Sequence, residues 1–546
     1  MDTVELILIL VAAVIGSQPL GRLLPFVPMP ILQIAIGVAL AWPVTGGVHV
    51  ELEPELFLLI FIPPLLFNDA WRAPKREFWR LRYSIASMAF GLVFFTIAAF
   101  GYALHWFVPA VPLVVAFAAA AVLSPTDAVA VSSIIDKDRL PPNLLHLLEG
   151  ESLLNDASGL VMFRFAVAAA LTGAFSLAAA SWAFVLAVAG GIAAGFICLW
   201  IGAKALKILA KASSGSAEAQ VLVIVLLPFL AYALAERWNA SGVLAAVFAG
   251  LFLARWGLFR HLNTSARMLA VSTWQVIGFT LNGAIFVFLG LQLPAIARTI
   301  PPELTNGIWL QPFLIVLTLT LCLMVLRFGF ILVTALIGRM VSRWRGERYQ
   351  GTTLRMKLAA TVAGVRGAVT LAGVMSLPLL MNGEPFPARD LVIFLATGVI
   401  FWWLIIAWLL LPALSRNLGD QGHGAATLEL KMARIATAKA AIARLESIAG
   451  GHSSETGAAT PRQAVAEGLI AGYRRKIAAL EQGESLPEEA RAEQRAQIEL
   501  RQAATEAEQE ALRAMLMRGE INDHTTQRLY QELTLDQATL ATKTRA

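Results

Sequence analysis

Charged residues are scarce in this chain. Asp, Glu, Lys and Arg together fill 15% of the 546 positions, whereas about a quarter of an average soluble domain is charged. Hydrophobic residues fill 58%. This balance excludes an ordinary soluble protein and indicates a lipid bilayer as the solvent. The formal net charge of +6 does not predict a nucleic-acid partner, because the basic residues fall in short loops between apolar segments.

Cysteine is nearly absent as well. The two cysteines, Cys198 and Cys322, each lie inside an apolar run, which excludes a disulfide framework and a cysteine-based metal cluster. The N-terminus lacks the basic flank of a cleavable signal peptide, so we expect the first apolar segment to be retained.

The sequence contains many long apolar runs. A spanning helix needs roughly 20 mostly apolar residues, and runs such as 177–203 and 312–337 exceed that length. We predict an all-α polytopic membrane protein with about 13 transmembrane helices. Their centres are expected near residues 12, 38, 61, 94, 122, 158, 190, 227, 248, 283, 323, 367 and 402.

The basic residues predict the orientation in the membrane. The clearest basic cluster follows the third predicted span and consists of Arg72, Lys75, Arg76, Arg80 and Arg82. The preceding loop carries Glu51 and Glu53 instead. Because Lys and Arg mark cytoplasmic loops, an odd number of crossings places the N-terminus outside and the C-terminus in the cytoplasm. We expect a bacterial cytoplasmic (inner) membrane.

The composition changes near Asn417, where Ala, Glu, Gln and Arg become common. We predict a transmembrane domain at 1–416 and a helical cytosolic C-terminal domain at 417–546. Helical runs are expected around 428–448, 464–480 and 487–517, with a Gly, Ser, Thr and Pro linker at 450–461. These helices either pack together or pair in a dimer, and a regulatory role stays open.

The fifth predicted span is interrupted by proline. Pro125 lacks the N–H that the carbonyl of Ala121 needs in a continuous helix, so the helix is expected to break or bend there. The freed carbonyl, the Thr126 hydroxyl and the Asp127 carboxylate are oxygen ligands that suit a small alkali cation. A simple proline kink with a locally capped aspartate is the alternative.

The sixth predicted span carries the densest polar cluster of any apolar segment, at 149–159. Ser152 and Asp156 are four residues apart and share a helix face, as do Glu151 and Asn155. Glu151 and Asp156 are five apart, which is about 140° around a helix axis. The two carboxylates therefore point differently, which argues against a shared proton and favours separate roles.

Each carboxylate can be given a role. Arg366, between Gly364 and Gly367 in the twelfth predicted span, is the best candidate for a buried structural ion pair with Glu151. Asp156 has no obvious helical neighbour that neutralises it. It can hold either a proton or a monovalent cation, with a second structural pair as the alternative.

Four stretches together resemble a known family: Ile-Pro-Pro-Leu-Leu-Phe at 62–67, Thr-Asp at 126–127, Gly-Glu-Ser-Leu-Leu-Asn-Asp at 150–156 and Val-Arg-Gly-Ala at 365–368. The chain resembles the bacterial NhaP-type monovalent cation/proton antiporters, relatives of the sodium/hydrogen exchangers. The resemblance covers roughly 1–415, and the tail stretch 512–540 looks like that of a bacterial subgroup.

The resemblance implies a fold of inverted repeats with discontinuous fifth and twelfth spans that cross near the midplane. It also implies a homodimer in which a core domain moves against a dimerisation domain. The implied cation ligands are Asp156, Asn155, Ser152, Asp127 and Thr126. Glu151 and Arg366 would form the stabilising pair.

Two positions depart from the family pattern. Asn68, followed by Asp69, stands where an acidic residue often follows the Pro-Pro motif, and Asn282 replaces an acid of the animal exchangers. We treat all three as candidates for the ion pathway. Arg164 and Arg327 are further cations inside predicted spans, and structural pairing is the default expectation for both.

The expected function is sodium/proton antiport in pH and sodium homeostasis, with potassium or lithium as alternative cations. Asn155 adds no second titratable proton, so 1:1 electroneutral exchange is predicted. No enzyme activity and no cofactor are expected. Two other classes stay open: a cation channel, and an intramembrane aspartyl protease with Asp127 and Asp156 facing each other.

Overall fold

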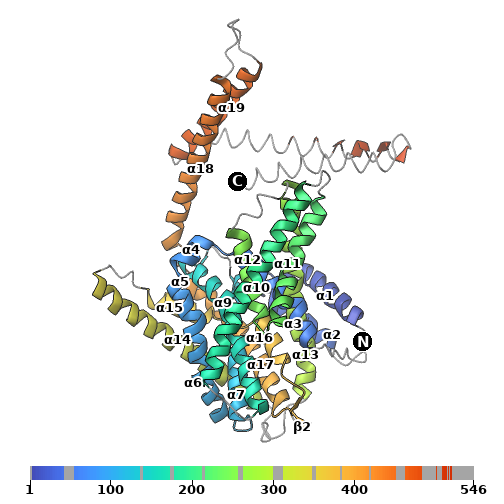
Figure 1. The fold of residues 1–546 in the computed structure, drawn as a ribbon, viewed down its shortest axis with the longest axis vertical. Helices are drawn as coiled ribbons and strands as arrows, with labels where there is room; N and C mark the ends of the chain where they lie inside the picture. Colours follow the sequence, from blue (N-terminus) through green and yellow to red (C-terminus); the bar gives the residue numbers. More distant parts are fainter. Residues whose placement is uncertain are drawn as a thin grey trace. The chain divides into compact units, whose positions relative to one another are not determined.

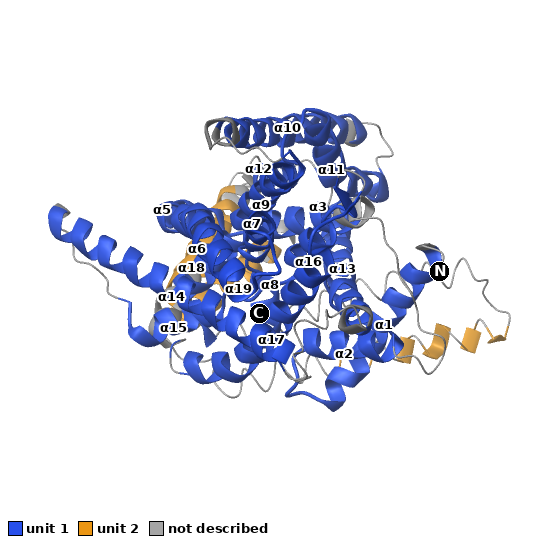
Figure 2. Ribbon diagram, turned by 90° about the horizontal axis from the view of Figure 1, so that it is seen from below, with its two compact units in different colours: residues 1–423 blue, residues 424–546 orange. Residues whose placement is uncertain are grey.

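The structure is a computed structural model. It describes residues 3–41, 54–135, 139–172, 177–211, 216–255, 262, 264–298, 311–346, 352–381, 384–416, 418, 420–450 and 461–482, with scattered positions between 500 and 518. The chain divides into two compact units, residues 1–423 and 424–546 (Figure 2). The boundary predicted at 416/417 lies just beyond α17 (Arg389–Ser415), and the cytosolic location of the second part stays a prediction.

The first unit consists mainly of α-helices (Figure 1). A π-helical turn at Ser87–Leu92 joins α5 to α6, and the strands β1 (Leu380–Met381) and β2 (Glu384–Pro385) pair antiparallel. The helices before α17 are α1 (Thr3–Leu23), α2 (Met29–Ala41), α3 (Pro54–Arg72), α4 (Lys75–Arg80), α5 (Arg82–Ala86), α6 (Val93–Phe107), α7 (Leu113–Leu123), α8 (Ala128–Ile134), α9 (Pro142–Thr172), α10 (Leu177–Lys211), α11 (Ala217–Arg237), α12 (Gly242–Arg255), α13 (Thr264–Arg298), α14 (Gln311–Arg345), α15 (Leu354–Val362) and α16 (Ala368–Met375).

The polytopic helical fold is confirmed. Among the described residues, eight helices are long and apolar enough to cross a membrane, and α7 with α8 would make a ninth, bent by 55°. All thirteen predicted centres fall within a described helix or, at residue 367, on the break between α15 and α16. The spans in α1, α10 and α14 are only 28% buried, so their apolar side chains need lipid as a solvent.

Both predicted discontinuous helices are present. The fifth span stops at Leu123 and resumes at Ala128, and the twelfth stops at Val362 and resumes at Ala368. The two breaks touch each other, because the backbone N–H of Asp127 donates to the carbonyl of Val365 over 2.7 Å. Backbone groups freed by one break are thus partly satisfied by the other, as the absence of water in a bilayer requires.

The transmembrane helices pack as two groups around two hydrophobic clusters. The smaller cluster joins α10, α11 and α12 to α3 and α13, where the rings of Phe67 and Trp274 lie 5.1 Å apart. The larger cluster centres on α7, α9, α15, α16 and α17 and also takes in parts of α1–α3, α6, α12, α13 and α14. The broken helices belong to the larger cluster, and this places their crossing inside a packed core.

The second unit takes in most of α18 (Asp420–Gly450) and all of α19 (Pro461–Gln482). The side chain of Lys431 donates to the carbonyl of Glu481 over 3.2 Å, and Arg474 pairs with Glu446 at 3.1 Å. These contacts are exposed, so each adds roughly 1 kcal/mol or less. The predicted linker and the third predicted run lie largely outside the described residues.

Candidate functional site

A small cavity of about 30 Å³ lies beside the crossing of the two broken helices. Since one buried water needs roughly 10–15 Å³ of such space, the cavity has room for a bare ion or very few waters. Apolar lining comes from α3, and Gly367 forms part of the wall. Its polar lining consists of Asp69, Thr126, Asp127, Ser152, Asp156, Asn282 and Thr370.

Asp156 is the acid of α9 that faces this cavity. Its side chain is buried, with 5% exposure. It forms no hydrogen bond or ion pair with any residue that the structure describes, so its carboxylate can accept a ligand. Ser152, one turn earlier on the same face of α9, lines the same cavity.

Asp127 and Ser152 both hold the start of α8. One carboxylate oxygen of Asp127 accepts from the backbone N–H groups of Val129 at 2.8 Å and Ala130 at 3.1 Å. The Ser152 hydroxyl accepts from the N–H of Ala128 at 3.3 Å. The local cap expected as the alternative role of Asp127 is therefore present, and the same residue also lines the cavity.

The cation that pairs with Glu151 is Arg327, and the predicted partner Arg366 is wrong. Two hydrogen bonds join the Arg327 guanidinium to the Glu151 carboxylate, of which Nη2 to Oε2 is 2.8 Å, and both side chains are at most 1% exposed. Arg327 also donates from Nε to the carbonyl of Ala360 over 3.2 Å. It packs on Gly364, where a Cβ atom would lie 2.5 Å from Nε.

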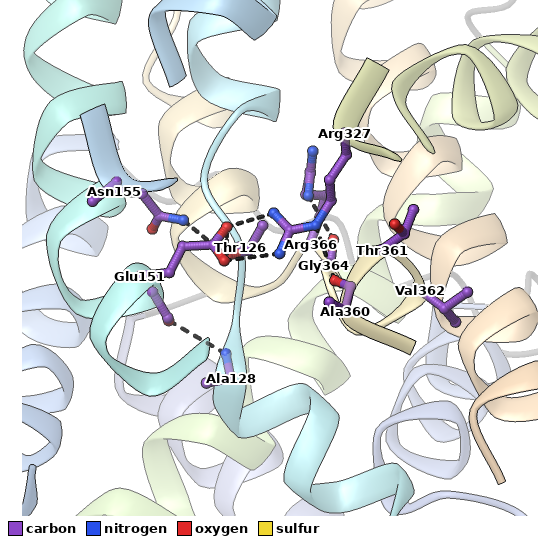
Figure 3. Close-up of polar contacts among 12 residues, drawn as sticks. Thr126, Ala128, Glu151, Asn155, Arg327, Ala360, Thr361, Val362, Gly364 and Arg366 are labelled. Atoms are coloured by element: carbon purple, nitrogen blue, oxygen red, sulfur yellow. Dashed lines mark hydrogen bonds and ion pairs between the residues drawn. The ribbon is translucent and has the colours of Figure 1, made fainter. Parts of the chain in front are cut away.

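Thr126 and Asn155 belong to the surroundings of this pair (Figure 3). The Thr126 hydroxyl donates to Glu151 over 3.3 Å and accepts from the side-chain amide of Asn155 at 2.8 Å. Thr126 also lines the small cavity, whereas Asn155 does not. The buried amide oxygen of Asn155 has no hydrogen-bond partner among the described residues. The five predicted ligands are therefore close together, but four of them, not five, line the cavity.

The carbonyl that Pro125 was expected to free is occupied. The hydroxyl of Ser124 donates to the carbonyl of Ala121 over 2.9 Å. Gly159 of α9 packs against the same place, since a Cβ atom there would lie 2.5 Å from the Pro125 ring. The proline bend is therefore stabilised by neighbouring protein groups.

Arg366 binds helix ends instead of a carboxylate. Its Nε donates to the carbonyl of Leu123 over 2.6 Å, and its Nη1 donates to the carbonyl of Gly364. Leu123 ends α7, and Gly364 follows the end of α15. The guanidinium lies over the ring of Trp403, 4.3 Å from its centroid.

A larger cavity of about 440 Å³ adjoins the small one. The two share Leu66, Asp69, Val129, Ser152 and Asn282 in their walls. The larger cavity also reaches Arg72 of the basic cluster and Asn68, whose buried amide oxygen has no partner among the described residues. All three predicted pathway residues therefore line it. Gln33, Glu149 and Gln275 in this wall were not predicted as pathway residues, because their convergence depends on how α2, α9 and α13 pack together.

A third cavity, of about 770 Å³, lies further along α9 and is lined by residues from Leu160 to Leu171 of that helix. Its wall contains the second intramembrane cation, Arg164, which pairs with Glu236 of α11 through contacts of 2.9 and 3.2 Å. The sequence predicted structural pairing for Arg164 and Arg327 without naming a partner for either. Both are paired with carboxylates in the structure.

Known proteins resemble this chain along most of its length. The family model described as sodium/hydrogen exchanger, transmembrane, matches residues 6–415. An Escherichia coli K12 protein described as an uncharacterized Na⁺/H⁺ exchanger, YjcE, is 39% identical over 552 residues, which cover 99% of each chain. A Bacillus pumilus protein named sodium, potassium, lithium and rubidium/H⁺ antiporter is 43% identical over 427 residues, which cover 77% of this chain and 62% of that relative.

The fold has a solved counterpart as well. The sodium proton antiporter MjNhaP1 from Methanocaldococcus jannaschii, solved at pH 8, matches with a TM-score of 0.57 and 17% sequence identity, over 77% of this chain and 100% of that one. At this identity the match concerns the fold alone. The family model, which covers the helices from α1 to α17, and the Escherichia coli relative show that this chain belongs to the sodium/hydrogen exchanger family.

Proposed function

We propose that this protein exchanges a monovalent cation for a proton, and that both compete for the carboxylate of Asp156. The observation that carries the proposal is the contrast between the two acids of α9. Glu151 is fully engaged by Arg327, whereas Asp156 faces the small cavity without a hydrogen-bond or ion-pair partner among the described residues. A buried carboxylate without a partner is costly as an anion, so it favours states in which a cation or a proton occupies it.

The cation would be held by Asp156 together with neutral oxygens and with oxygens that also accept backbone N–H groups of α8. Ser152, Thr126, Asp127 and Asn282 supply these in the cavity wall. Oxygen ligands of this kind suit sodium, and they also accept potassium or lithium. The Bacillus pumilus relative is named an antiporter of sodium, potassium, lithium and rubidium, which supports a monovalent cation as the substrate but does not select one of the four.

One exchanging carboxylate gives 1:1 electroneutral exchange. The carboxylate of Asp127 accepts two backbone N–H groups, so we assign it to capping α8 and not to proton exchange. Asn155 carries no proton that could titrate near neutral pH. Each cycle would therefore replace one positive charge by another.

Entry to the site would run through the larger cavity, past Asn68, Asp69 and Asn282. Arg72 belongs to the basic cluster and lines this cavity, so the open side would be the cytoplasm. We further propose the remaining expected features: an inner-membrane homodimer with its N-terminus outside and its C-terminus in the cytoplasm, acting in pH and sodium homeostasis.

The test is ion-driven proton movement in proteoliposomes that contain a pH-sensitive dye. Asp156→Asn should abolish proton movement driven by sodium, potassium or lithium gradients. Asp390→Asn removes a carboxylate at the largely exposed start of α17, 61% exposed, and should leave exchange unchanged. Exchange that survives in Asp156→Asn would refute the assignment. A voltage response during turnover of the native protein would refute electroneutrality, and cation flux without a counter-ion would indicate a channel.

A further inference from the structure

Two helix C-termini meet at the crossing, and each presents carbonyl groups that its own helix cannot satisfy. α7 ends at Leu123 and α15 ends at Val362. The carbonyl ends of helices carry partial negative charge. Three of these carbonyls have donors from elsewhere: Leu123 and Gly364 accept from Arg366, and Val362 accepts from the indole N–H of Trp403 at 3.0 Å.

Trp403 of α17 contacts both parts of this arrangement. Its ring lies under the Arg366 guanidinium at 4.3 Å, and its N–H binds the end of α15. Trp403 is fully buried and Arg366 is 2% exposed. Attraction between a cation and an aromatic face is strongest when water is excluded, and tryptophan is the best partner for it.

Arg366 depends on this ring because carboxylates are in short supply around it. The nearby guanidinium of Arg327 already takes both oxygens of Glu151. Among the described residues, Arg366 has no carboxylate within ion-pair distance. The helix-end carbonyls and the face of Trp403 are therefore the electronegative groups in direct contact with this buried cation, while Glu151 attracts it from beyond ion-pair distance.

The position of Arg366 determines part of the cavity wall. Arg366 lies in the non-helical segment 363–367, between Val365, which accepts the backbone N–H of Asp127, and Gly367, which lines the small cavity. A Cβ atom on Gly367 would lie 1.8 Å from a carboxylate oxygen of Asp127, so this segment has no room to shift toward the site.

We propose that Trp403 is a positioning residue for the cation site. It does not line the small cavity; it acts through Arg366, which it holds in place so that segment 363–367 and Asp127 keep their geometry around the ion. The inference rests on the proposed function of Asp156. A loosened segment misplaces the oxygen ligands, so cation affinity should fall more than the maximum rate. A merely structural role would lower the amount of folded protein without changing the half-saturating cation concentration.

The experiment compares three variants with the native protein in proteoliposomes, with sodium as the probe. Trp403→Leu removes the ring and the N–H, and Trp403→Phe keeps an aromatic face but loses the N–H. Trp408→Phe is the matched control, because this indole of the same helix also donates to a backbone carbonyl, that of Phe26 at 2.8 Å. We expect the half-saturating sodium concentration to rise about fivefold in Trp403→Leu, which corresponds to about 1 kcal/mol, because only part of the energy of a desolvated cation–aromatic contact reaches the site through Arg366. The rise should be smaller in Trp403→Phe. Trp408→Phe should match the native protein.

Each outcome decides the inference. Half-saturation within twofold of the native value in Trp403→Leu, in protein that elutes as a single native-like species, would overturn it, as would an equal rise in Trp408→Phe. If Trp403→Leu does not reach the membrane, Trp403→Phe decides: an unchanged value overturns the inference and a raised value supports it. If the native protein itself shows no cation-driven proton movement, the proposed function fails, and the inference fails with it.

Discussion

At the scale of single residues, the two acids of α9 show what helical spacing can and cannot predict. The five-residue separation of Glu151 and Asp156 predicted that they point differently, and the structure directs one to Arg327 and the other to the small cavity. The identity of the pairing cation was not predictable in the same way. Arg327 and Glu151 are 176 positions apart. Their contact depends on how α14 is packed relative to α9, which helical periodicity within one segment does not predict.

The closest approach at the site leads to a prediction about Gly367. Gly367→Ala places a methyl group where a carboxylate oxygen of Asp127 now lies, so either the crossing or the α8 cap must move. We expect exchange to fall by about tenfold or more, since ångström-scale misplacement of active groups commonly has such effects. The measurement is sodium-driven proton movement in proteoliposomes.

Gly329→Ala serves as the control, because a Cβ atom on this glycine of α14 would meet nothing within 4 Å. That variant should exchange normally and be as stable as the native protein or slightly more so, since alanine favours the helix. Normal exchange in Gly367→Ala would contradict the tight crossing.

At the scale of helices, the break in the fifth span was predictable because proline acts locally, whereas the break in the twelfth span was expected from the family resemblance. Pro125 ends α7, and Gly364 and Gly367 lie in the gap between α15 and α16. The π-helical turn at Ser87–Leu92 was not predicted. The Ser158 hydroxyl of α9 donates to the carbonyl of Ala89 in this turn over 2.7 Å, so it too involves a residue distant in sequence.

The pair of Arg164 and Glu236 leads to a prediction about relative movement of helices. It joins α9, which carries the site, to α11, which packs mainly on α10 and α12. If exchange requires the two helix groups to move past each other, fixing this contact should stop it. We would replace both residues by cysteine, with Cys198 and Cys322 changed to alanine, and join the new pair with a short bis-thiosulfonate reagent, which forms a disulfide with each cysteine by releasing sulfinate and is cleaved by a reducing agent.

The cross-linked protein should lose exchange, and cleaving the linker should restore it. Each single-cysteine variant treated with the same reagent controls for modification alone. Undiminished exchange in fully cross-linked protein would mean that α9 and α11 keep their relative position throughout the cycle.

At the scale of the whole molecule, competition for one carboxylate sets how pH acts. Protons and cations exclude each other at Asp156 in the proposed cycle, so acid raises the cation concentration needed for half-saturation. With each unit of rising pH this concentration should fall, by up to about tenfold where the proton dominates, while the maximum rate changes little. Initial rates measured against sodium concentration at several pH values check this. A half-saturating concentration independent of pH would contradict competition at a single site.

The general architecture was the most predictable feature, because the bilayer imposes it. Every predicted span centre coincides with a helix or a break between helices, since backbone groups in lipid leave few alternatives to helices. The cavities were not predictable, because their walls combine side chains from α2, α3, α8, α9 and α13. Which side chains converge there depends on tertiary packing and not on any one segment.

The size of the small cavity has a consequence for what travels with the ion. A volume of about 30 Å³ admits only about two or three water-sized bodies, since each needs roughly 10–15 Å³ of such space, and this is less than an alkali cation with its full shell of coordinated water requires. A cation bound in this cavity would therefore keep few of its waters, and oxygen atoms of the protein would replace the rest. Exchange of this cation for a proton would thus change the ionic content of a cell while carrying few water molecules with the ion.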